Sequence, residues 1–277
     1  FSKKKNIPIV LYNASVGPID HEGGRQALQK VLDCSPLVIT RDTQTRELIE
    51  KLRLRHPEIV VHADCALNTQ IPPEARLQEI IRKEDLFKGP GGTIGLNINA
   101  YIDDWSQTGS LSSRDFHGII AGTADRLIEE LDVDILFTVT QVMDMKSTLD
   151  CVNLIRRQDR VRVVGNKDYT YQELAGLLSR VQVHAGLRTH TLIFCAAVGT
   201  PMISINAYPK SAGFLKTIGM GDWCIDFSGL AVDSLTALIR LAWDSRGELR
   251  DRMVPVVEAE KGKARASVGL VSRILAG

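Results

Sequence analysis

The sequence predicts an α/β fold made of two Rossmann-like domains. Short apolar runs that suit buried parallel strands alternate along the chain with stretches of helical periodicity. The connections between these runs are only a few residues long, as is typical of strand–helix–strand units. A glycine- and proline-rich stretch at residues 88–92 separates two such series, and we place the boundary between the domains there.

The first domain covers residues 1–90. Its apolar runs predict strands, and its amphipathic stretches predict helices, in strict alternation. Asp42 or Thr43 suits the N-cap of the second helix. The predicted strands are residues 7–12, 36–40 and 59–63, and the predicted helices are residues 22–32, 43–55 and 74–82.

The second domain covers residues 93–255 and repeats the alternation. The predicted strands are residues 93–99, 134–139, 161–164, 181–185, 202–206 and 223–227. The predicted helices are residues 115–131, 147–157, 171–181, 189–198 and 234–245. A last helix covers most of residues 248–274, and Pro255 predicts a break or kink in it because proline lacks the amide N–H of a helix interior. Residues 256–277 are expected to form a final helix outside the second domain.

The stretch from residue 181 to residue 216 carries the main candidate site. It predicts a strand, a helix that ends at Gly199, and a second strand. Such units have parallel strands, so the loops that leave both strands lie at the same, carboxyl edge of the sheet. The first loop brings Arg188 and His190 to a helix start, and the second brings Lys210.

A helix start, two cations and an imidazole suit a small ligand that carries phosphate and carboxylate groups. The alternative is purely structural. Arg188 would then form a surface ion pair, His190 would be a satisfied core histidine, and Lys210 would be a solvated loop residue. His184 lies within an apolar strand, and we expect it to be structural.

Four more residues lie where strands end and could line a ligand site. Ser15 and Gly17 form a tight turn that exposes backbone N–H groups. Asn97 and Gln141 follow two strands of the second domain. Each could hydrogen-bond a ligand at the carboxyl edge.

Arg41 ends a strand of the first domain. From the residues alone it could face a cleft between the domains. It could equally form a salt bridge with Asp42 or Asp64.

The composition of the chain excludes several classes of function. The chain has 277 residues, a net charge of +1 and 24% charged residues, which gives no electrostatic case for nucleic acid as a bulk partner. No apolar run approaches the length of a membrane span. The five cysteines form no C-x-x-C pair, and no cluster has metal-ligand spacing, so we expect a cytoplasmic protein without a metal site.

Three motifs resemble the signature of the polysaccharide pyruvyltransferase family. They are residues 187–194, which read LRTHTLIF, the Gly-Thr-Pro turn at residues 199–201, and residues 208–211, which read YPKS. In that family an Arg-Leu-His triplet opens a helix, and a lysine follows the next strand. This chain differs at Thr189, where leucine is usual, and at Gln141, near which a histidine is common. The usual opening Asn-x-Gly-Asp segment is not found, so we expect the first strand and helix of the domain to be missing.

The resemblance implies a GT-B-like arrangement of two Rossmann-like domains with a cleft between them, and a last helix that packs back on the first domain. It implies transfer of the pyruvate group of phosphoenolpyruvate to a saccharide as a ketal, in the synthesis of a cell-surface polysaccharide. Phosphoenolpyruvate is then the donor, and no cofactor is needed. A homo-oligomer is left open.

The resemblance also implies roles for the candidate residues. His190 would be the general acid, while Arg188 and Lys210 would hold the phosphate and the carboxylate. The donor would also be contacted by Arg41, Thr189, Ser15, Gly17, Asn97 and Gln141. Two alternatives remain from the residues: a glycosyltransferase of the same fold that uses a nucleotide sugar, with Asp226 as the candidate for its ribose, and a binding protein without catalysis.

Overall fold

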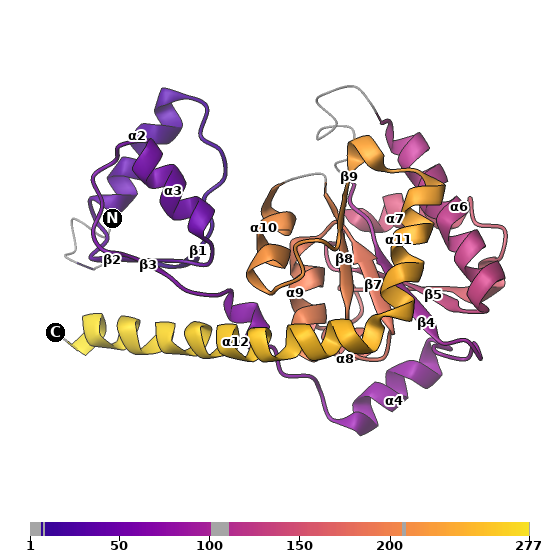
Figure 1. Cartoon of the computed structure of the whole chain (residues 1–277). Coiled ribbons are helices and arrows are strands. Elements are labelled where there is room, and N and C mark those ends of the chain that lie inside the picture. Colours follow the sequence, from indigo (N-terminus) through magenta and orange to yellow (C-terminus); the bar gives the residue numbers. More distant parts are fainter. Residues whose placement is uncertain (1–6, 8, 101–110, 207–208, 277) are drawn as a thin grey trace. The chain divides into compact units, whose positions relative to one another are not determined.

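A computed structural model describes residues 7, 9–100, 111–206 and 209–276. The chain divides into two compact units (Figure 1). The first unit contains Phe1–Asn68 together with Glu258–Gly277, and the second contains Thr69–Val257. Each unit has its own parallel sheet and helices, as the alternating pattern of the sequence predicted.

The first unit is built on a parallel sheet in the order β1-β2-β3. Its strands are β1 (Val10–Ala14), β2 (Leu37–Thr40) and β3 (Ile59–Val61), and its connecting helices are α2 (Glu22–Leu32) and α3 (Thr43–Lys51). Leu32, Val38, Ile49 and Leu54 form its buried core. Asp42 is the N-cap of α3, as predicted, and its side chain accepts a hydrogen bond from the Thr45 N–H at 2.7 Å.

The second unit is built on a parallel sheet in the order β6-β5-β4-β7-β8-β9. Its strands are β4 (Thr93–Asn97), β5 (Asp134–Val139), β6 (Val161–Gly165), β7 (Val183–Gly186), β8 (Met202–Asn206) and β9 (Cys224–Asp226). The chain starts at β4 in the middle, runs outward to β6, and returns to the other side of β4 with β7. This is the strand order of a dinucleotide-binding Rossmann fold.

Helices cover both faces of the second sheet. The helices are α4 (Glu74–Lys83), α6 (Ser113–Leu131), α7 (Asp144–Val152), α8 (Tyr171–Leu178), α9 (Thr189–Val198), α10 (Pro209–Thr217) and α11 (Val232–Asp244). Because strand order reverses at β4, right-handed crossovers put α6 and α7 on one face and α9 and α10 on the other. In agreement, α6 contacts α7 and α11, whereas α9 contacts α8 and α10. Figure 1 shows α9 and α11 on opposite sides of β7 and β8.

Two glycines make room for a buried histidine in the middle of the second sheet. His184 in β7 is 0% exposed and lies opposite Gly95 of β4. A Cβ atom at Gly95 would lie 2.5 Å from its Nδ1, and one at Gly186 would lie 2.9 Å from its Nε2. Larger side chains would therefore displace the imidazole ring. Its burial agrees with the structural role that the sequence predicted.

The division between the units differs from the predicted boundary at residues 88–92. It falls between Asn68 and Thr69, because α4 packs on α8 in the second unit. Within this packing Arg76 pairs with Glu173 at 2.7 Å. Residues 88–92 are a tight turn into β4: the Gly89 N–H donates to Asp134 Oδ2 at 2.6 Å, and a Cβ atom on Gly91 would lie 2.3 Å from the Leu131 carbonyl oxygen. Here the glycines serve close packing inside one unit.

The last helix, α12 (Arg246–Ala276), also differs from the prediction. It runs through Pro255 as one element, so of the two outcomes predicted there, a break or a kink, the break does not occur. Leu249, Met253 and Val257 are buried at helical spacing on both sides of the proline. Packing of these side chains offsets the hydrogen bond that the proline removes. None of the described helices has the length and apolarity needed to cross a membrane.

Candidate functional site

The candidate site lies where strand order reverses in the second sheet. Strands β4 and β7 are neighbours there, and the polypeptide leaves their carboxyl ends in opposite directions. Ligands of open α/β sheets bind at such a point. Arg188 lies two residues after the end of β7 and is the N-cap residue of α9, and its side chain makes no capping hydrogen bond to this helix. The amide groups of the first turn of α9 therefore suit an anion.

Arg188 forms a two-point ion pair with a buried carboxylate. Its Nε donates to Asp144 Oδ2 at 2.8 Å, and its Nη2 donates to Asp144 Oδ1 at 2.7 Å. The Arg188 side chain is 20% exposed, whereas the Asp144 side chain is 0% exposed. Arg188 is thus the outer member of the pair. It is not the bare cation that the sequence suggested, because Asp144 offsets part of its charge.

Asn97 holds the backbone of Arg188. Its Oδ1 accepts a hydrogen bond from the Arg188 N–H at 2.9 Å, and its Nδ2 donates to the Thr138 carbonyl oxygen at 2.8 Å. The residue is 2% exposed. We therefore place Asn97 among the residues that position Arg188, rather than among those that contact a ligand.

Two threonines fix the first turn of α9 on either side of His190. The Thr189 hydroxyl lies 2.8 Å from the Ser211 hydroxyl in α10, and the Thr191 hydroxyl lies 3.1 Å from that of Thr140 after β5. His190 lies between them and is exposed. The threonine that replaces the usual leucine thus uses its hydroxyl to join α9 to α10.

The two other candidates of the second unit lie in the neighbouring loops. Gln141 is exposed in the turn between β5 and α7. Lys210 is in the first turn of α10, next to Ser211, and its side chain lies outside the described part of the chain. Asp226, the residue considered for a ribose, ends β9 and accepts a hydrogen bond from Asn206 Nδ2 at 3.1 Å.

The candidates of the first unit meet at the carboxyl edge of the other sheet. The Arg41 N–H donates to the Ala14 carbonyl oxygen at 3.1 Å, so Arg41 is next to the turn that contains Ser15 and Gly17. Its side chain pairs with Asp64 at 2.6 Å, one of the two partners considered from the sequence. The Asp64 side chain is 7% exposed. A contact of Arg41, Ser15 or Gly17 with the donor stays a prediction.

Sequence reasoning missed the residues that hold Arg188 and the first turn of α9 in place. Asp144 follows the turn after β5 and begins α7, but an acidic residue in the first turn of a helix is common on a surface. Its burial could not be inferred from the pattern. The sequence did not indicate the contacts of Ser211 and Thr191 either, because a hydroxyl group in a helix does not reveal which residue it contacts.

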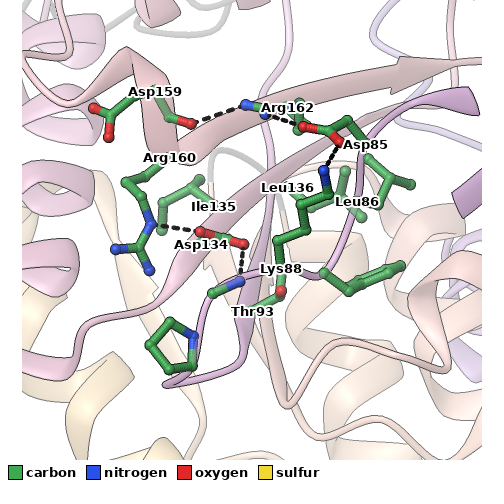
Figure 2. A pocket seen from close by; sticks show the side chains of 13 residues that line it. Asp85, Leu86, Lys88, Thr93, Asp134, Ile135, Leu136, Asp159, Arg160 and Arg162 are labelled. Atoms are coloured by element: carbon green, nitrogen blue, oxygen red, sulfur yellow. Dashed lines mark hydrogen bonds and ion pairs between the residues drawn. The ribbon is translucent and has the colours of Figure 1, made fainter. Parts of the chain in front are cut away.

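A cavity of about 320 Å³ lies at the opposite, amino edge of the second sheet. Figure 2 shows its charged lining, in which each cation is paired with a carboxylate. Arg160 pairs with Asp134 at 2.6 Å, Arg162 pairs with Asp85 at 2.8 Å, and Lys88 also pairs with Asp85. The Arg162–Asp85 pair joins the loop before β4 to β6, and the Arg160–Asp134 pair joins the start of β5 to the residue before β6. The cavity is therefore a poorer site for an anion than the start of α9.

The solved structures that this chain resembles show a fold of the GT-B type. Across the whole chain the fold matches HepE of Anabaena, solved in complex with UDP and glucose, with a TM-score of 0.63 and 10% identity over 73% of that protein. It also matches UDP-GlcNAc 2-epimerase from Neisseria meningitidis, solved with bound UDP-GlcNAc, with a TM-score of 0.68 and 10% identity over all of this chain and 72% of that protein. At such low identity the likeness concerns the fold alone.

The chain belongs to the polysaccharide pyruvyl transferase family, whose model matches residues 1–207. The match includes the Arg188–His190 segment and ends before Lys210. A relative with 22% identity over 261 residues is the amylovoran biosynthesis protein AmsJ of Erwinia amylovora. The alignment covers 92% of this chain and 62% of AmsJ, so the chain spans less than two thirds of its relative.

Proposed function

We propose that this protein transfers the pyruvate group of phosphoenolpyruvate to a saccharide as a ketal, in the synthesis of a cell-surface polysaccharide. The observation that supports it most is the start of α9. A helix N-terminus that the side chain of its N-cap residue does not cap, Arg188 itself and an exposed His190 occur together at the reversal of strand order. This segment lies inside the region that matches the family.

The donor needs such a site because phosphoenolpyruvate carries both a phosphate and a carboxylate. Backbone N–H groups and the helix dipole at the start of α9 favour one anionic group. The planar guanidinium of Arg188 favours the other by two parallel hydrogen bonds. We assign Lys210 to the same donor, since α10 begins beside α9 through the contact between Ser211 and Thr189.

His190 is the proposed general acid. It donates a proton to C3 of the enol, and C2 becomes an oxocarbenium-like centre that keeps the phosphate oxygen. One saccharide hydroxyl adds to C2 and loses its proton. A second hydroxyl then displaces inorganic phosphate from C2 and closes the ketal, and its proton leaves with the phosphate. An imidazole suits the first step because its ordinary pKa lies near neutral pH.

Donor binding tests the proposal without knowledge of the acceptor. Calorimetry should detect binding of phosphoenolpyruvate to the 277-residue chain, and the ligand should raise its melting temperature. Lys210→Ala should weaken this binding at least tenfold. Lys216→Ala, which changes an exposed lysine of the same helix, should leave it within twofold.

Other outcomes separate the alternatives. Binding of UDP-sugars without binding of phosphoenolpyruvate would favour the glycosyltransferase. Donor binding without release of phosphate, when the chain is given the glycans of its own source, would favour a binding protein. Equal donor affinity in wild type and Lys210→Ala would remove the lysine from the site.

A further inference from the structure

We propose that Asp144 is a positioning residue that orients the guanidinium of Arg188 toward the donor. This inference rests on the proposed function. Asp144 is the first residue of α7 and is 0% exposed. Both of its carboxylate oxygens bind Arg188, and Oδ1 also accepts a hydrogen bond from the Ala100 N–H at 3.0 Å.

The geometry of the pair fixes the direction of the guanidinium. Asp144 engages the edge formed by Nε and Nη2, so the plane of the group is set by two contacts. The edge formed by Nη1 and Nη2 is then directed away from Asp144. Asn97 fixes the backbone of the same residue through its N–H. The side chain and the main chain of Arg188 are thus held from two different elements, α7 and β4.

Stability alone is a poor explanation for this pair. Burying a carboxylate is costly, and apolar residues of similar volume often stabilise a fold as well as a buried ion pair does. The pair also sits at the edge where ligands of this fold bind. Asp144 lowers the net positive charge of the site, so it weakens the attraction of an anion. Its carboxylate also fixes the direction of Arg188, which indicates that the pair serves to orient the arginine.

Two ligands separate orientation from attraction. Inorganic phosphate is a compact anion that tolerates many directions of approach, whereas phosphoenolpyruvate must place its phosphate and its carboxylate at once. Asp144→Asn keeps the shape of the side chain but removes the charge, so Arg188 loses one of its two strong contacts. It also removes a negative charge that repels anions.

Calorimetry of Asp144→Asn should therefore show phosphoenolpyruvate bound at least tenfold more weakly and inorganic phosphate bound at least as tightly as by wild type. The matched control is Asp125→Asn. Asp125 is 4% exposed and pairs with Arg156 at 3.1 Å, near the other end of α7. That variant should bind both ligands as wild type does.

Arg188→Lys tests the same inference if Asp144→Asn does not fold. Lysine keeps the charge but loses the planar fork. It should bind phosphate within threefold of wild type and phosphoenolpyruvate at least tenfold more weakly. The inference is overturned if both ligands weaken together in Asp144→Asn, or if either variant binds phosphoenolpyruvate as wild type does. A wild-type chain that does not bind phosphoenolpyruvate would instead refute the proposed function.

Discussion

Mild acid should destabilise the second unit through His184. This imidazole is 0% exposed, and neither ring nitrogen has a hydrogen-bond partner among the described residues. Burial lowers the pKa of His184 from 6.5 to about 3, because the charged form loses its hydration. The folded protein therefore keeps the ring neutral at pH values where the unfolded chain protonates it.

The direction and size of the effect follow from these two pKa values. The folded pKa is lower than the unfolded one, so the contribution is fully present above pH 6.5 and is lost as the pH falls toward 3. Each pH unit within this window costs about 1.4 kcal/mol of unfolding free energy. At pH 4.5, two units below the unfolded pKa, the loss is about 3 kcal/mol. The full loss, near pH 3, is on the order of 5 kcal/mol.

Urea unfolding at pH 7.5, 6.5, 5.5 and 4.5 measures this loss. The three tryptophans lie within Thr69–Val257, so their fluorescence reports on the second unit. His184→Gln cannot titrate, and its unfolding free energy should fall less steeply with pH than that of wild type. His56→Gln changes an exposed histidine and should keep the wild-type slope. Parallel curves for wild type and His184→Gln would refute the reasoning.

Four further outcomes are expected. His190→Gln should lower turnover by about 10²–10⁴-fold while donor affinity, measured by calorimetry, changes far less; near-normal turnover would assign the proton to another group. Gly95→Ala should lower the free energy of unfolding in urea by about 1–3 kcal/mol, because its Cβ would lie 2.5 Å from the His184 ring. The control Gly118→Ala, at an open position on α6, should leave the free energy of unfolding unchanged or raise it. Thr170→Ala should cost about 1 kcal/mol in the same assay by removing the capping box at α8. Arg162→Ala, at the cavity of the amino edge, should leave the affinity for phosphoenolpyruvate unchanged; a tenfold loss would move the donor site to that cavity.

The alternation of strands and helices and the class of the fold could be predicted from the sequence alone. Apolar periodicity depends only on neighbouring residues, so it was readable at β7, α9 and β8. The end of α9 could also be predicted from neighbouring residues alone. Gly199 has a φ of 78°, a conformation that suits glycine best, and Pro201 follows it. The placement of Arg188 and His190 at a helix start was available for the same reason.

The residues that hold Arg188 in place could be identified only from the long-range contacts of the folded chain. Asp144 and Arg188 are 44 positions apart, and their pairing requires that β5 and β7 flank β4. The unit boundary was also decided by long-range contacts, since α4 joins the second unit through α8. A glycine-rich stretch has the same sequence pattern whether it links two domains or allows close packing. The difference lies in which residues contact its backbone. For residues 88–92 the backbone meets Asp134 and the end of α6.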